Sequence, residues 1–567
     1  MVAALRRGRN HEGSACTMLF RGDDGSTANL HDTPAPPKKI NFFVRVLLKH
    51  YSDSEYVRTP EQIRREATIF GREFNKWYIL PFCILTQFCC GSMYSWSIYN
   101  QPIDQLLYGN PLANMSPTTF YITVGSFGFT SAILGPWLER NSPRLSLMIG
   151  TSLFYVGNLL TALGLHLRTI VLVYIGYGLI GGAGLGSSYV VTVSTVTKWF
   201  PNSRGIASGL AVCGFGAGSI AFAKIPLLFM HNIGLPLTFV SMGSIFFVVV
   251  FLCSLFLRTP PPGYNINGLI IESSRTASKS MDGDSHLDTV DDRPTIRISL
   301  IQALTSRDFW LMYFVFMANQ LFGLVVISRL SNMTQSLFNV SPNGAATIVS
   351  IDGGFNLFGR IFFAAISDLI GRKVTFGFML GGQCLVLGFM ATVMADKSYW
   401  AYLMISWVGT ACYGGGFAVI PAFLSDMFGP NNISACHGLI LTAWSIAAIG
   451  GGLLFTGLYN RLSAIYGRLD PYPYTVNMWW IFGFVCFGFL LLFLVRSLIR
   501  DRLFPAVPGQ VLRVRLFGRM IRLVRANGWT IEMLTREQED HEWEEYLMLC
   551  IVKLRLVKNE AYHQATF

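Results

Sequence analysis

The residue with the clearest potential for chemistry is Arg360, which lies in the apolar stretch FNLFGRIFFAAISD at 355–368. Asp352, Asn356 and Arg360 are spaced by four, so on a helix their side chains share one face. An arginine at the centre of a membrane helix costs about 2.5–3.5 kcal/mol to insert, and such residues usually have a function. A guanidinium can bind a carboxylate through two parallel hydrogen bonds. The spacing therefore predicts a polar stripe that binds a small anion.

Two other interpretations of this stripe remain open. Arg360 could neutralise Asp352, or its side chain could extend to the membrane surface. Asp352 could also exchange a proton. Aromatic residues of other apolar runs could form the walls of the anion site, although each alone is more common in packing: Tyr94, Trp96, Tyr189, Tyr413 and Trp444.

The composition indicates which elements hold these residues. The chain has 567 residues, of which 52% are hydrophobic and 13% charged, against about 25% charged in ordinary globular proteins. Twelve apolar runs, each near the roughly 20 residues that cross a bilayer, are centred near residues 88, 128, 156, 183, 216, 247, 318, 356, 384, 410, 446 and 486. The sequence therefore predicts an all-α membrane protein with twelve transmembrane helices.

The basic residues predict the orientation of these helices. The net charge is +12, and of the 44 lysines and arginines 13 precede the first run, 12 follow the last, and most others fall in alternate loops. By the positive-inside rule both termini are cytoplasmic, and the basic balance needs no nucleic acid to explain it. A cleavable signal peptide is not recognisable, and the N-terminal leader favours the plasma membrane over an organelle membrane.

An internal repeat divides the chain into two halves. A shift of 229 residues aligns GPWLERNSPR (135–144) with 364–373, and WFPNSRGIASG (199–209) with FGPNNISACHG (428–438). Each half has an even number of runs, which predicts a parallel repeat about an axis along the membrane normal. The expected parts are a tail (1–75), a six-helix bundle (76–258), a linker (259–307), a second bundle (308–498) and a basic tail (499–567).

The repeated acidic and basic loop resembles the signature of the major facilitator superfamily. GSMYSWSIYNQP (91–102) and KWFPNSRGIASGLAVCGFGAG (198–218) are similar to segments of its oxalate/formate antiporter and monocarboxylate porter branch. The resemblance implies two pseudo-symmetric six-helix bundles around a central cavity, and secondary active transport of a small organic anion by alternating access. A coupled proton or counter-anion would complete the cycle, and the protein is expected to be monomeric and to need no cofactor.

The resemblance also implies roles for individual residues. Oxalate carriers of the branch have an arginine at the position of Arg360, and a span-eleven lysine in the motif YTAK. Here LTAW (441–444) places Trp444 at the position of that lysine, which favours a monocarboxylate over a dicarboxylate. The repeated loops are expected to form a cytoplasmic latch, with a solvated turn as the alternative. Its candidate residues are Glu139, Arg140, Arg144, Asp368, Arg372 and Lys373.

The remaining sequence features carry weaker predictions. Residues 507–525 interleave arginine with apolar residues and could lie on the anionic inner leaflet, with a small cytoplasmic partner-binding module as the alternative. REQEDHEWEEYL after them is expected to be helical. This tail keeps a second class of function open, a non-transporting sensor built on the same fold. No set of residues typical of an enzyme or a metal site is recognisable, and His437 is not expected to be a ligand. Glycosylation of the sequons at Asn114, Asn332 and Asn339 is left open.

Overall fold

The computed structural model describes most of the chain between residues 68 and 546. The described residues are 49–51, 59, 61, 68–69, 72–111, 113–200, 204–260, 265–266, 269–270, 300–429, 433–467, 470–497, 501, 507–516, 519–525, 528–546 and 548. Most of the predicted N-terminal tail (1–75) and of the predicted linker (259–307) lies outside them.

The first half of the chain is helical almost throughout. It begins with two short strands that pair in antiparallel fashion, β1 (Thr68–Ile69) and β2 (Arg72–Glu73). The helical elements that follow are η1 (Lys76–Tyr78), α4 (Ile79–Cys90), the 3₁₀ segment η2 (Gly91–Ile98), α5 (Asn100–Tyr108), α6 (Pro117–Arg140), α7 (Pro143–His166), α8 (Ile170–Val173), the π-helical η3 (Tyr174–Gly181), α9 (Gly182–Trp199), α10 (Arg204–Phe222), α11 (Ile225–Ile233) and α12 (Leu235–Ser254).

The second half repeats this arrangement with longer helices. Two short strands, β3 (Asn265–Ile266) and β4 (Leu269–Ile270), lie between the halves. The helical elements of the second half are α13 (Leu300–Thr305), α14 (Arg307–Phe338), α15 (Pro342–Ile370), α16 (Arg372–Ala395), α17 (Tyr399–Phe428), α18 (Ile433–Ile446), the π-helical η5 (Ala447–Gly451), α19 (Gly452–Tyr466) and α20 (Tyr472–Leu494).

The long helices account for all twelve predicted spans. Eleven helical segments of the described residues are long and apolar enough to cross a membrane, and each coincides with one predicted run. The remaining run corresponds to α6, whose 24 residues extend for about 36 Å, although its serines and threonines make it less apolar. The predicted all-α membrane fold is therefore confirmed.

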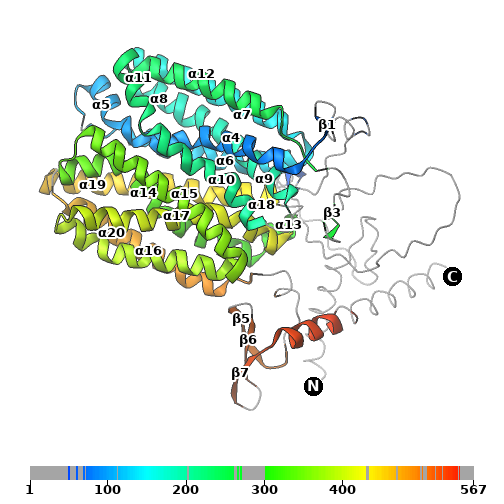
Figure 1. The fold of residues 1–567 in the computed structure, drawn as a ribbon. Coiled ribbons are helices and arrows are strands. Elements are labelled where there is room, and N and C mark those ends of the chain that lie inside the picture. Colours follow the sequence, from blue (N-terminus) through cyan, green and yellow to red (C-terminus); the bar gives the residue numbers. More distant parts are fainter. Residues whose placement is uncertain are drawn as a thin grey trace, which may run out of the picture.

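The two halves meet along two pairs of helices. α6 of the first half packs against α18 of the second, and α10 packs against α15. Figure 1 shows the helices of the first half, from blue α4 to green α12, on one side of this interface, and the yellow-green to orange helices of the second half on the other. We call the end of the bundle that carries β1, β3 and α13 the linker end, and the opposite end, with α5 and α11, the far end (Figure 1).

Glycines allow the backbones to approach closely at this interface. A Cβ atom added to Gly135 of α6 would lie 2.6 Å from the carbonyl oxygen of Ser434 in α18. A Cβ atom at Gly438 of α18 would meet the carbonyl oxygen of Ser131 in α6. Close approach of membrane helices through small residues increases the packing between them.

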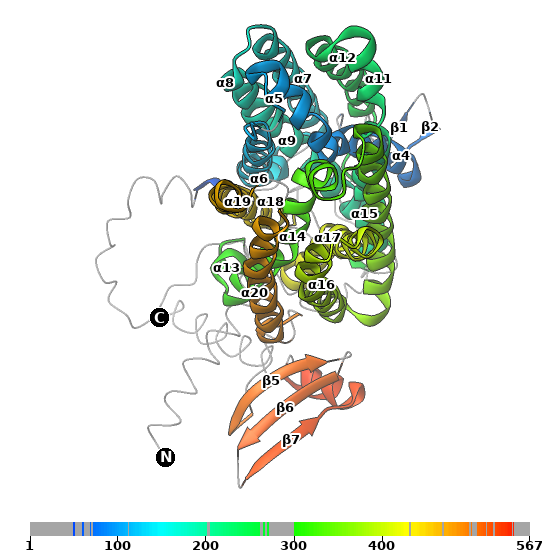
Figure 2. The same cartoon turned by 90° about the vertical axis from the view of Figure 1, so that its left-hand side faces the viewer.

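The C-terminal tail contains a small antiparallel sheet. Strands β5 (Gln510–Leu516), β6 (Arg519–Arg525) and β7 (Trp529–Met533) pair in the order β5–β6–β7, as Figure 2 shows. A helix over residues 536–546 follows them, which agrees with the helix predicted there. Most of the basic stretch 507–525 therefore lies in the first two strands of this sheet, and its location on the membrane surface stays a prediction.

Charged side chains connect the strands to the helix of the tail. Arg515 binds both carboxylate oxygens of Asp501, at 2.6 Å and 3.0 Å, and also pairs with Glu539. Burial opposes the charge of Arg515, but the bonds from the two carboxylates outweigh it and raise the pKa of the guanidinium. Arg522 pairs with Glu542 at 2.6 Å. The tail is thus held together by ion pairs in addition to its sheet.

Candidate functional site

Arg360 is buried where the two halves of the protein meet. Its side chain is 1% exposed, and it lies in α15 of the second half. Its Nε donates to the side-chain oxygen of Asn356 at 2.8 Å, and its Nη1 donates to the backbone oxygen of Val212 in α10 at 3.1 Å. Its Nη2 lies 3.4 Å from the hydroxyl of Tyr94 in η2. Substrate sites of carriers built from two repeats lie at such an interface.

Aromatic rings surround the guanidinium of Arg360. Its central carbon lies 5.2 Å from the ring centroid of Phe417, 5.4 Å from that of Phe215 and 5.9 Å from that of Tyr94. Phe417 belongs to the second half, whereas Phe215 and Tyr94 belong to the first. A cation over aromatic faces gains about 2 kcal/mol or more when it is desolvated. The rings therefore help to keep this charge inside the membrane.

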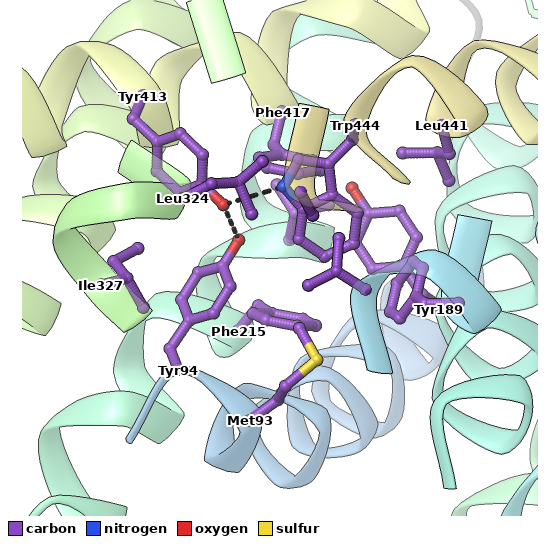
Figure 3. Packing of buried hydrophobic residues seen from close by; sticks show 14 of the residues in the cluster. Met93, Tyr94, Tyr189, Phe215, Leu324, Ile327, Tyr413, Phe417, Leu441 and Trp444 are labelled. Atoms are coloured by element: carbon purple, nitrogen blue, oxygen red, sulfur yellow. Dashed lines mark hydrogen bonds between the residues drawn. The ribbon is translucent and has the colours of Figure 1, made fainter. Parts of the chain in front are cut away.

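We call the rings of Tyr94, Phe215 and Phe417 around Arg360 the cage. A chain of hydrogen bonds extends from the cage across the interface. The hydroxyls of Tyr94 and Tyr413 are 2.8 Å apart, and the indole nitrogen of Trp444 donates to the Tyr413 hydroxyl at 3.2 Å (Figure 3). Figure 3 shows the three side chains converging from η2, α17 and α18. The structure thus connects Tyr94, Tyr413 and Trp444 to Arg360, and their role as walls of a substrate site stays a prediction.

Several buried polar atoms near Arg360 have no hydrogen-bond partner among the described residues. They include the amide nitrogen of Asn356 and both ring nitrogens of His437, while the hydroxyl of Tyr189 lies beside Arg360 itself. The rings of Tyr189 and His437 are 5.8 Å apart, and Tyr189 also packs edge-on against Phe215. Buried polar groups in native proteins are almost always paired, so these atoms are available to bind a polar ligand. His437, which we did not expect to be a ligand, carries two of these atoms.

Two predicted site residues lie away from Arg360. Asp352 is buried two helical turns before it, faces α17, and forms no ion pair with Arg360 within 4 Å in the described part of the chain. The structure therefore does not support the interpretation that Arg360 neutralises Asp352. Trp96 is fully buried, but its indole nitrogen donates to the backbone oxygen of Ser116, and its ring packs on Tyr177 at 4.5 Å.

The position of Trp96 follows from the geometry of its helix. Residues two apart on a helix do not share a face, so Tyr94 and Trp96 cannot both point at the interface. Tyr94 points toward Tyr413, and Trp96 points into the core of the first bundle. We therefore no longer include Trp96 in the site.

Charged residues connect the two halves at the linker end. Asp368, near the end of α15, pairs with Arg372 at 2.5 Å and accepts a hydrogen bond from the backbone nitrogen of Ile206 in α10 at 3.0 Å. Arg372 also pairs with Asp426 at 3.2 Å. This cluster connects α10 of the first half to α15 of the second, and its action as a latch stays a prediction. We call Asp368, Arg372 and Asp426 the latch.

The other predicted latch residues are placed differently. Arg144 donates from its Nε to the backbone oxygen of Leu257, just after α12, at 2.9 Å. Lys373 donates to the backbone oxygens of Phe493 and Val495, at the end of α20, at 3.0 Å and 2.7 Å. Both residues thus cap the last helix of their own half, where orphan carbonyls favour a cation. The side chains of Glu139 and Arg140 lie outside the described residues.

The fold and the buried interfacial site define a membrane transporter. The chain belongs to the major facilitator superfamily, whose family model matches residues 82–452. It is accordingly a secondary transporter and not an enzyme, as the sequence predicted.

Three curated relatives are similar to much of the chain. An uncharacterized MFS-type transporter of Escherichia coli, YhjX, is 26% identical over 66% of this chain and 86% of its own length. The oxalate:formate antiporter of Oxalobacter formigenes is 27% identical over 67% of this chain and 84% of its own. The apicoplast pyruvate carrier 1 of Toxoplasma gondii is 22% identical over 51% of this chain and 59% of its own.

Proposed function

We propose that this transporter moves a small monocarboxylate across its membrane by alternating access, with Arg360 binding the carboxylate. The observation that carries the proposal is a buried guanidinium that contacts both halves of the protein and has no acidic partner among the described residues. Three of its five N–H groups donate to the neutral partners Asn356, Val212 and Tyr94, and the Tyr189 hydroxyl lies beside it. The amide nitrogen of Asn356 and the ring nitrogens of His437 would supply further polar contacts.

The substrate class follows from the charge of the site. Among the described side chains around the cage Arg360 is the cation, and Trp444 stands where related carriers have a lysine. A single guanidinium balances one carboxylate, so a second carboxylate would be buried without a counter-charge. Two relatives are named for small carboxylates, oxalate and formate in one case and pyruvate in the other. A coupled proton or an exchanged anion would make the cycle secondary active.

The proposal includes an orientation and a domain division. We place both termini and the linker (259–307) in the cytoplasm, with the bundles at 76–258 and 308–498, and we assign the carrier as a monomer to the plasma membrane. The latch then closes the cytoplasmic side. A protease-sensitive tag in the linker tests this: it should be cut in opened cells and protected in intact ones. Cleavage from outside intact cells would reverse the orientation.

A sensor is the second candidate function, and the folded C-terminal tail is the observation that favours it. A tail that only attached to the membrane surface would need no folded sheet, whereas this tail has one that Arg515 and Arg522 stabilise through ion pairs. Purified protein in proteoliposomes separates the two functions. A carrier accumulates labelled carboxylate inside the vesicle, whereas a sensor binds the carboxylate and leaves the vesicle interior empty.

A further inference from the structure

A second arginine, Arg329 of α14, is buried toward the far end of the protein. Its side chain is 2% exposed. Leu324 and Ile327 of the same helix belong to the packed cluster drawn in Figure 3, which also contains Tyr94, Tyr413 and Trp444, and Arg329 follows Ile327 by two residues, about 3 Å along the axis. Because α14 begins with Arg307 at the linker end, Arg329 lies beyond that cluster, toward the far end.

The guanidinium of Arg329 connects the two halves through neutral groups. Its Nε donates to the hydroxyl of Tyr121 at 3.1 Å and its Nη1 to the side-chain oxygen of Asn114 at 2.8 Å, both in the first half. Its Nη2 donates to the hydroxyl of Thr456 in α19, in the second half, at 2.7 Å. Within the described part of the chain, no carboxylate lies within 4 Å of it.

Asp104 of α5 binds the segment that carries Asn114. Asp104 of α5 accepts hydrogen bonds from the backbone nitrogens of Asn114 at 2.9 Å and Ser116 at 3.1 Å, and from the Ser116 hydroxyl at 2.6 Å. These bonds fix the loop that presents the Asn114 amide to Arg329. Asp104 therefore positions the partner of Arg329 and does not neutralise its charge. Phe455 and Tyr459 contribute ring faces at 5.1 Å and 5.8 Å.

This arrangement has a consequence for the opening of the far end. A buried cation without a counter-ion is costly. The neutral groups around Arg329 offset this cost only while both halves contact it, that is, while the far end is closed. When the halves separate at the far end, the bonds from Arg329 to Asn114 and Tyr121, on the one side, or to Thr456, on the other, must break. The guanidinium is then left facing the open pathway with unpaired donors. An anion that enters there is its natural partner.

We propose that Arg329 is a second anion-binding site, which takes the carboxylate of the transported anion when the protein is open at the far end. The anion then passes to Arg360 as Asn114, Tyr121 and Thr456 close around Arg329 again. The proposal rests on the proposed function and adds to it a point of entry or release on one side of the membrane. It requires the two arginines to act at different steps.

Transport kinetics measured separately from the two sides test the proposal. Arg329→Gln replaces the guanidinium by an amide, which still donates hydrogen bonds but carries no charge. We expect it to raise the half-saturating carboxylate concentration about tenfold at the far end and less than twofold at the linker end. Asn114→Asp should have the same one-sided effect, because it adds a competing carboxylate at a position whose φ of 62° suits Asp as well as Asn. Arg461→Gln, an exposed position of α19, is the matched control.

A chemical probe tests the charge without any transport. A cysteine at Thr456 should react faster with an anionic than with a cationic methanethiosulfonate reagent, and Arg329→Gln should reverse or abolish this preference. Sodium acetate should slow the reaction, and equimolar sodium chloride should not. Equal reagent rates in both backgrounds, or equal half-saturation on both sides for both variants, would overturn the site at Arg329. If no carboxylate is transported at all but the reagent preference holds, the proposed function fails and the anion site stands.

Discussion

Replacement of Arg360 by lysine is the sharpest perturbation of the proposed substrate site, because it keeps the charge and removes the planar fork. The guanidinium binds Asn356 and Val212 through two different nitrogens while Nη2 faces Tyr94. A lysine has one nitrogen with three donors and cannot make these bonds and also bind a carboxylate bidentately. We expect Arg360→Lys to insert and fold but to transport poorly.

The size of the loss follows from the bonds that the lysine cannot make. A hydrogen bond to a charged group contributes about 1.5–3 kcal/mol, so loss of one bond to the carboxylate lowers the transport efficiency roughly 10- to 150-fold. The assay is the initial uptake rate in proteoliposomes, normalised to the inserted protein. Arg461→Lys, which changes an exposed arginine in the same way, should stay near the parent rate.

The same assay distinguishes a binding role from a structural one. Arg360→Ala removes an intramembrane charge and should insert at least as well as the parent, while its uptake is lost. If Arg360 served to neutralise Asp352, the double variant Arg360→Ala with Asp352→Asn would recover uptake. Recovery in the double variant, or near-normal uptake with lysine, would refute the assignment of Arg360 to the substrate.

Three further predictions concern the elements around the site. Asp368→Asn should weaken the pair with Arg372, so that the linker end opens more often and cysteines placed there react several-fold faster with a thiol reagent. An unchanged reaction rate would refute the role of Asp368 as a latch. Gly135→Ala should lower the melting temperature by several degrees through its clash with α18, whereas Gly354→Ala, with nothing within 4 Å, should not; equal effects would contradict the packing. Arg515→Ala should expose the tail to limited proteolysis by stranding two carboxylates, while uptake continues; loss of uptake would favour the sensor.

The features that the sequence predicts well are those with a strong periodic or repeated signal. Long apolar runs define the spans, since a bilayer admits no other low-cost structure for such segments. The 229-residue repeat relates the two halves, and the isolated arginine in FNLFGRIFFAAISD marks the centre of the interface. Asp368 and Arg372 form the predicted pair across the break between α15 and α16, where Gly371 has a φ of 91°.

The remaining features depend on contacts between distant segments. Arg329 lies 22 residues into a 32-residue helix, and by sequence it resembles an arginine near the outer surface. Its burial comes from Asn114 and Thr456, which no local pattern connects to it. Arg144 and Lys373 are aligned by the repeat, but only the structure shows that each caps the last helix of its half. No pattern in the sequence around His437 indicates that this residue is buried.

The central claim is that a carboxylate is recognised and moved, and counterflow in proteoliposomes tests it most directly. Vesicles with the purified protein are loaded with an unlabelled short carboxylate and diluted into the labelled one, with formate, acetate, pyruvate and oxalate compared. We predict transient accumulation of a labelled monocarboxylate, little of oxalate, and none of the uncharged amide of the same acid. Equal accumulation of the amide, or binding of the carboxylate without accumulation, would contradict the account.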